Sequence, residues 1–146
     1  MEIISSKDNK RIKYIRSLLE KGSIRKKSKA FVVEGIKLTD EALEYGKVIE
    51  VVCAVSLYDE IISGDLSGNR LLAENDKNIT NYVKKGSSLT VVSDAVFKSL
   101  SETITPQGIL AVAEMPDYGL LDKGFLEQVY IKNGKIKLLV LEDTAD

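Results

Sequence analysis

The residues of this chain best suited to chemistry are basic, and they lie near its start. Residues 1–37 contain eleven Lys and Arg against four Asp and Glu, a difference of +7, although the whole 146-residue chain has a net charge of −1. The densest group is Arg25, Lys26 and Lys27. Lys and Arg bind phosphate, Arg through paired hydrogen bonds, so this segregation predicts a surface that attracts a polyanion. A solvated lysine-rich surface without a partner is the alternative interpretation.

Other residue types that build common catalytic sites are scarce. The sequence has no His and one Cys, Cys53, which excludes a His-based triad, the His-containing zinc sites and an internal disulfide. Cys53 lies in an apolar run and is expected to be a small buried hydrophobic residue rather than a nucleophile. The glycine-rich patterns that hold nucleotides do not occur, and the acids Glu142, Asp143 and Asp146 are interpreted as solvated. We therefore predict no catalytic residue, no cofactor site and no metal site in this sequence.

The first element that must position the basic residues is a helix over residues 8–21. Asp8 can cap it, and apolar side chains recur at helical spacing along it up to Gly22. An arc of four side chains faces away from that apolar stripe: Lys10, Lys13, Tyr14 and Lys21. Residues 22–29 have no apolar face, so they are predicted to form an exposed loop or frayed turn that carries Arg25.

Apolar runs then alternate with helical patterns as far as Ala113. Strands are expected at residues 30–33, 48–55, 89–92 and 108–113. Helices are expected to end at Gly46, Gly86 and Leu100, with Ser93 as the cap of the last, while residues 57–75 give no clear pattern. This alternation predicts an α/β protein with a three-layer α/β/α sandwich.

The end of the sequence predicts the start of a second domain. Residues 115–119 form a plausible linker, residues 120–129 favour a helix, and residues 136–141 form a strongly apolar strand. A strand this apolar needs neighbours and helical cover that the five residues after it cannot supply. We therefore expect a fragment with three parts: a domain at 1–114, a linker with a short helix at 115–135, and the first strand of a truncated domain at 136–146.

Three stretches together resemble the SpoU/TrmH family of RNA ribose 2′-O-methyltransferases. The first comprises residues 4–13 (ISSKDNKRIK), the basic residues 25–27 and residues 31–35 (FVVEG), and is similar to the family's N-terminal substrate-binding segment. The second, residues 97–112, is similar to the loop and strand that close that domain. The third, residues 138–146, is similar to the strand that opens the catalytic domain. The chain departs from the pattern at Lys10, where many relatives have Pro, and at the final turn, of which only Asp146 is present.

This resemblance implies a small ribosomal-protein-like RNA-binding domain followed by an incomplete start of a knotted SPOUT α/β methyltransferase domain. S-adenosylmethionine is implied as the cofactor of the full-length parent, which is expected to be a homodimer. The segments that carry the catalytic Arg, the cofactor loops and the dimer interface in the family are absent from this sequence. The fragment is therefore expected to bind structured RNA, with ribosomal RNA as the expected partner, and to be catalytically inactive.

The resemblance also assigns roles to particular residues of this chain. The residues expected to bind RNA are Asn9, Lys10, Lys13, Arg25, Lys26, Lys27, Thr105, Gln107 and Gly108. Lys and Arg would hold phosphates, Asn9 and Gln107 would bond to sugars or bases, and Gly108 would let two backbones approach. Glu34 repels phosphate, so a structural role is expected, either through an ion pair with Arg25 or as a cap of the following helix.

Two other functions fit the sequence less well. A stand-alone ribosomal-protein-like RNA-binding module would share the basic surface but would leave the apolar strand at residues 136–141 without a purpose. A small-molecule enzyme would need an apolar pocket with convergent polar groups, which the sequence does not indicate. No apolar run approaches the roughly 20 residues of a membrane span and no signal peptide is recognisable, so a cytoplasmic protein without membrane contact is expected.

Overall fold

The computed structural model describes residues 2–64, 77–86, 88–101 and 103–116 of the chain. Residues Met1–Pro116 form one compact unit. The expectations for the linker beyond Pro116, the helix at 120–129 and the strand at 136–141 lie outside the described residues. The elements in chain order are β1 (Ile3–Ile4), α1 (Lys10–Glu20), α2 (Gly22–Ser28), β2 (Ala30–Glu34), α3 (Ile36–Tyr45), β3 (Val48–Ala54), α4 (Val55–Ser63), α5 (Lys77–Lys85), β4 (Leu89–Val92), α6 (Asp94–Leu100) and β5 (Ile109–Glu114).

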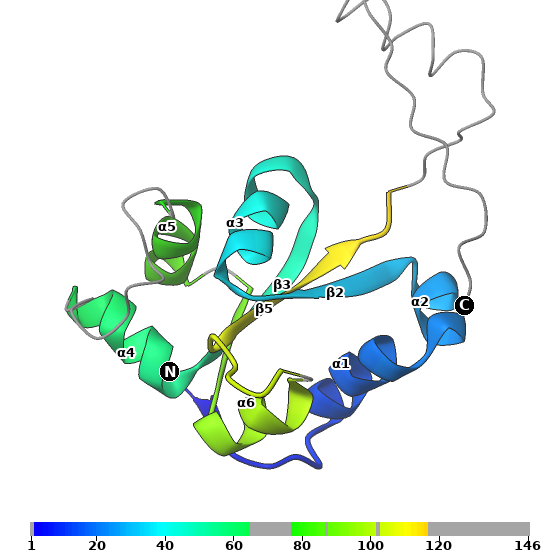
Figure 1. The fold of residues 1–146 in the computed structure, drawn as a ribbon, viewed down its shortest axis with the longest axis horizontal. Coiled ribbons are helices and arrows are strands. Elements are labelled where there is room, and N and C mark those ends of the chain that lie inside the picture. Colours follow the sequence, from blue (N-terminus) through cyan, green and yellow to red (C-terminus); the bar gives the residue numbers. More distant parts are fainter. Residues whose placement is uncertain (1, 65–76, 87, 102, 117–146) are drawn as a thin grey trace, which may run out of the picture. The chain divides into compact units, whose positions relative to one another are not determined.

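A five-stranded mixed sheet forms the middle layer, with the strand order β1-β4-β3-β5-β2. β1, β4 and β3 run parallel, whereas β5 is antiparallel to both β3 and β2. The carboxyl ends of β1, β4, β3 and β2 therefore share one edge of the sheet with the start of β5. The loop between α6 and β5 and the turn between β2 and α3 both lie at that edge (Figure 1).

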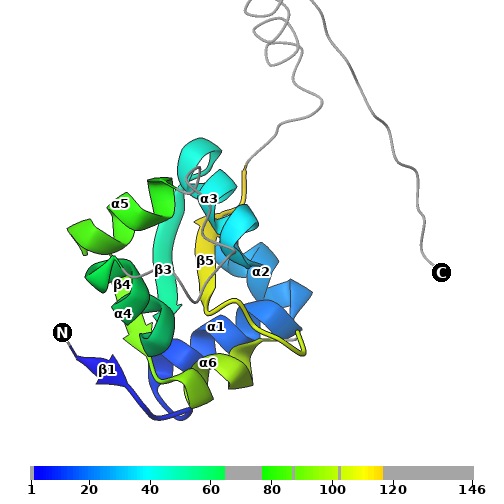
Figure 2. The same ribbon diagram turned by 60° about the vertical axis from the view of Figure 1, so that its left-hand side comes forward.

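Helices cover both faces of the sheet, which confirms the predicted three-layer α/β/α fold. On one face, α1 and α6 bury Ile12, Ile15 and Phe97 against the sheet. On the other face, α3, α4 and α5 bury a second apolar cluster that includes Leu57 and Cys53 (Figure 2). Because each face has its own fully buried cluster, the sheet is held in place from both sides. None of the helices in the described ranges is long and apolar enough to cross a membrane.

The basic segment at residues 22–29 is helical, so the prediction of an exposed loop there was wrong. α2 occupies Gly22–Ser28 and ends at Lys29, which adopts the left-handed conformation with φ 48°. Ile24 is half-buried against the α1 and α6 cluster, and this one contact leaves no periodic signal in the sequence. The basic residues occupy the last turn of the helix, where positive charge is favoured by the helix dipole.

Candidate nucleic-acid interface

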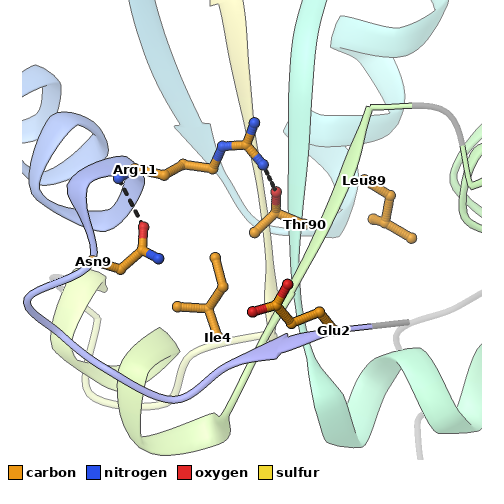
Figure 3. A pocket seen from close by; sticks show the side chains of 6 residues that line it. All are labelled: Glu2, Ile4, Asn9, Arg11, Leu89 and Thr90. Carbon is orange, nitrogen blue, oxygen red and sulfur yellow. Dashed lines mark hydrogen bonds between the residues drawn. The ribbon is translucent and has the colours of Figure 1, made fainter.

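Asn9, predicted to bind RNA, is the N-cap of α1. Its side-chain oxygen accepts a hydrogen bond from the backbone N–H of Arg11 at 2.8 Å, which satisfies one of the free amides of the first turn. The N-cap therefore lies one residue later than the expected cap at Asp8. Asn9 also lines a pocket of about 400 Å³ beside the sheet edge (Figure 3). The pocket is lined by Glu2, Ile4, Asn9, Arg11, Leu89 and Thr90.

Arg11, which the sequence interpretation passed over, is anchored to the sheet at that pocket. Its Nη1 donates to Thr90 Oγ1 at 2.9 Å (Figure 3). Its Nε lies 3.4 Å from Glu50 Oε1. The Thr90 hydroxyl in turn donates to Glu50. Glu50 is the one charged residue in the otherwise apolar strand β3. A carboxylate in such a strand needs a cationic partner, so Glu50 was the feature of the sequence that could have indicated the role of Arg11. The charge of Arg11 is therefore compensated within the protein.

The outer side of α1 is exposed, as its apolar stripe predicted. Lys10 and Lys13 are exposed, and Tyr14 is 42% exposed. Lys13 Nζ lies 2.8 Å from Asp8 Oδ1, and this hydrogen bond from the ammonium lowers the pKa of Asp8 below its usual range. Both side chains of that ion pair are exposed, so Lys13 can exchange Asp8 for a phosphate with little cost.

Arg25 is turned toward the protein, whereas Lys26 and Lys27 are exposed on α2. Arg25 Nη1 donates to the carbonyl oxygens of Leu18 and Leu19 at 2.7 and 2.8 Å. These carbonyls belong to the last turn of α1, where the helix supplies no donor of its own. Arg25 therefore joins α2 to the end of α1, and Lys26 and Lys27 remain as exposed cations on α2.

Glu34 orders a loop, but not the one expected. Its carboxylate accepts hydrogen bonds from the hydroxyls of Ser101 and, at 3.2 Å, of Thr103. Among the described residues, Arg25 bonds to α1 and forms no ion pair with Glu34, so that predicted pairing was wrong. The physical reason is the sheet order, since β2 lies beside β5 and therefore places Glu34 next to the loop that leads into β5.

The loop at residues 101–108 is tied to the β2–α3 turn at its other end as well. Gln107 Oε1 accepts from the backbone N–H of Ile36 at 2.7 Å and so caps α3. Gly108 is buried with φ 78°, and a Cβ there would lie 3.2 Å from the Leu57 Cβ. The close approach at Gly108 is therefore to α4 inside the protein. Thr105 is exposed at the surface of the loop.

The expected RNA-binding residues thus fall into three places rather than one. Lys10 and Lys13 lie at the start of α1, Lys26 and Lys27 lie beyond its other end on α2, and Thr105 lies on the loop at the carboxyl edge of the sheet. α1 and α2 contact each other directly, so the first two groups lie on neighbouring helices (Figure 1). This arrangement can hold an extended polyanion along α1 and α2.

Two observations bear on nucleophilic and metal chemistry among the described residues. Burial raises the pKa of Cys53 to about 12, so the thiol stays neutral, as expected for a core residue. The described part of the chain holds no group of three His, Cys, Asp or Glu side chains that could bind a metal. What the domain offers instead is an exposed basic side and an ordered loop.

The family model of the MRM3-like substrate binding domain matches residues 9–111. The chain belongs to this family. The match covers most of the first two of the three stretches that resembled SpoU/TrmH methyltransferases, leaving out residues 4–8 and 112, and it includes α1, α2 and the closing loop. The third stretch lies outside it.

Curated and solved relatives of this MRM3-like domain are RNA methyltransferases. The 23S rRNA (guanosine(2553)-2′-O)-methyltransferase RlmP of Bacillus subtilis is 26% identical over 117 residues, which are 80% of this chain and 39% of the relative. A solved RNA 2′-O ribose methyltransferase is 25% identical with a TM-score of 0.57, covering 82% of this chain and 40% of that one. These similarities confirm the recognised family, and the chain spans about two fifths of the length of these relatives.

A further solved relative shares the fold of this domain. The AdoMet-bound rRNA methyltransferase from Sinorhizobium meliloti is 20% identical with a TM-score of 0.55, covering 79% of this chain and 37% of that one. At this identity the likeness concerns the fold alone.

Proposed function

We propose that this chain is the RNA substrate-recognition part of an S-adenosylmethionine-dependent RNA ribose 2′-O-methyltransferase and is itself catalytically inactive. The observation that carries the proposal is the set of exposed cations on α1 and α2 of a substrate-binding domain. None of the described carboxylates pairs with Lys10, Lys26 or Lys27. Such cations are free to displace counterions from a phosphate backbone.

The RNA surface is proposed to run along α1 and α2 and to include the closing loop. Lys10, Lys13, Lys26 and Lys27 would contact phosphates, and Thr105 would bond to a sugar or base. Asn9, Arg25, Gln107 and Gly108 would act by holding these elements in place, because each is engaged within the domain. A ribosomal RNA is the proposed substrate, since RlmP of Bacillus subtilis is named for 23S rRNA.

S-adenosylmethionine does not fit the pocket beside Asn9. The lining of this pocket is mostly polar, its Arg11 and Thr90 are already bonded within the protein, and it has no aromatic or glycine-rich wall for an adenine. We therefore assign no step of methyl transfer to these residues. The cofactor and the homodimer interface are proposed to belong to other parts of a longer protein, which would act in the cytoplasm.

RNA affinity measured across a salt series tests the proposal. Fluorescence anisotropy with a structured ribosomal RNA fragment should show binding that weakens steeply with salt, by about 0.7 to 0.9 log units per log unit of salt for each phosphate contact. Lys26→Glu combined with Lys27→Glu should lower the affinity at least tenfold and flatten the slope. S-adenosylmethionine titrated by calorimetry should release no heat.

The matched control is the reversal of Lys84 and Lys85, an equally exposed pair in the last turn of α5 on the other face of the sheet. This double variant should bind RNA much as the unmodified chain does. Equal losses for the two pairs would mean that binding follows overall charge and that the proposed surface is wrong. A chain that fails to bind RNA even at low salt, or that binds the cofactor saturably, contradicts the proposed function.

A further inference from the structure

The loop between α6 and β5 exposes one large apolar side chain almost completely. Ile104 is 96% exposed, more than any other large hydrophobic residue of the described ranges. Its neighbours Thr103 and Thr105 are exposed as well, and they are polar. An isoleucine left in water brings no stability to the fold, so this side chain is available to a partner.

This loop is held at both ends. Near its start, the Thr103 hydroxyl donates to Glu34 at 3.2 Å and the Thr103 N–H donates to Ser101 Oγ at 3.1 Å. Near its end, Gln107 accepts from Ile36 N–H at 2.7 Å, and the Gly108 carbonyl accepts from Ala54 N–H at 2.8 Å. Ile104 is thus displayed on a segment whose ends are fixed to neighbouring elements.

The chain itself also stiffens the loop next to Ile104. Pro106 fixes its own φ and restricts Thr105 to extended backbone. A segment that is ordered before binding loses little conformational entropy when it meets a partner. The exposed isoleucine is therefore suited to make a contact rather than to collapse onto the domain.

The surroundings of the loop favour RNA over a protein as that partner. Ile104 is the one large exposed hydrophobic among the described residues of the loop, whereas a stable protein interface needs about 800 Å² on each side. The loop is bonded to the first turn of α3, where the exposed Lys37 follows Ile36. A single apolar side chain flanked by threonine hydroxyls, on a loop bonded to a helix that begins with an exposed cation, suits the face of a base with its sugar and phosphate.

We propose that Ile104 packs against the face of an unpaired RNA base, with the Thr105 hydroxyl and Lys37 within reach of the attached sugar and phosphate. This inference rests on the proposed function and adds a preference for RNA that has unpaired bases. In a continuous duplex the base faces are stacked on one another, so Ile104 finds no surface to cover. The cations of α1 and α2 bind phosphates in either kind of RNA.

Two RNAs of equal length test this inference: a hairpin with an unpaired loop and a blunt duplex. Ile104→Ala should weaken binding to the hairpin about five- to tenfold, with an unchanged salt slope, and should change binding to the duplex less than about twofold. Ile104→Phe should keep or raise hairpin affinity, because an aromatic ring stacks on a base. Circular dichroism should show the same thermal melting for both variants, since the side chain contacts almost nothing in the domain.

Ile62→Ala is the matched control, because Ile62 is 48% exposed on α4. It should leave both affinities unchanged. If Ile104→Ala binds the hairpin as tightly as the unmodified chain, or if it loses affinity equally for hairpin and duplex, the inference is wrong while the proposed function stands. If the unmodified chain binds neither RNA, the proposed function fails and this inference fails with it.

Discussion

At the scale of single residues, several side chains with the chemistry to bind RNA are used to build the domain. Asn9 caps α1, Gln107 caps α3, and Arg25 bonds to the last carbonyls of α1. Amide and guanidinium groups can either cap a helix or bind RNA, because the free N–H and C=O groups at helix ends form the same kinds of hydrogen bond as the polar groups of a nucleotide. Neither the residue type nor the position in the sequence therefore distinguishes the structural role of Arg25 from the exposed position of Lys26.

Arg25→Ala should lower the free energy of unfolding by about 1–3 kcal/mol, because it removes charge-assisted hydrogen bonds to two α1 carbonyls. Urea denaturation followed by circular dichroism measures this loss. Lys26→Ala, a neighbouring and exposed cation, should change stability by less than about 0.5 kcal/mol. An Arg25→Ala variant that unfolds like the unmodified chain but binds RNA poorly would instead identify Arg25 as a direct RNA contact.

At the scale of elements, the closing loop and the β2–α3 turn are built together. Glu34 receives the hydroxyls at the start of the loop, and Gln107 near its end caps α3. Gly35 lies between these contacts with φ 100° and ψ 159°, a conformation essentially restricted to glycine. The N–H of Gly35 donates to Ile109 at 2.9 Å, so the turn is also bonded to β5. The surface that displays Ile104 therefore depends on residues some 70 positions earlier in the chain.

Gly35→Ala should destabilise the domain by about 2–3 kcal/mol, since the added Cβ would lie 2.9 Å from Gln107 Oε1 in a backbone conformation that alanine avoids. Thermal unfolding is the measurement. Gly86→Ala provides the comparison: φ there is 67° and a Cβ would meet no atom within 4 Å, so the cost should be limited to about 1 kcal/mol of backbone strain. Equal losses at the two glycines would contradict the interlocked turn and loop.

At the scale of the whole molecule, both apolar clusters and all described strands lie within Met1–Pro116. The first cluster joins α1 and α6 to one face of the sheet, and the second joins α3, α4 and α5 to the other. Cooperative folding of a small domain requires a core of this kind. The exposed cations of α1 and α2 lie on elements that the same unit contains.

A variant comprising residues 1–116 should therefore unfold in a single cooperative transition and bind the structured RNA within about twofold of the full chain. Circular dichroism and anisotropy test the two parts of this expectation. Loss of cooperative unfolding would show that residues 117–146 contribute to the stability of the first unit. Loss of RNA affinity with the fold intact would move part of the RNA surface into those residues.

Much of the architecture was determined by the sequence itself. Alternating strands and helices predicted the three-layer fold, Ser93 was correctly identified as the cap of α6, and the apolar run around Cys53 predicted its burial. These features depend on spacing within a few residues, which a sequence displays directly. Two stretches of the resemblance also marked the family, and the match to residues 9–111 confirmed it.

The tertiary structure alone decided which polar side chains meet. Arg11 reaches Thr90 across 79 positions, Glu34 reaches Thr103 across 69, and Gln107 caps a helix 71 positions earlier. Residues 22–28 are a second example, because their composition favoured a loop but the structure has a helix there. Ile24 of this helix is half-buried against the α1 and α6 cluster. Such pairs form because the order of strands brings segments that are distant in sequence next to one another, and this order is set by packing on both faces rather than by local sequence.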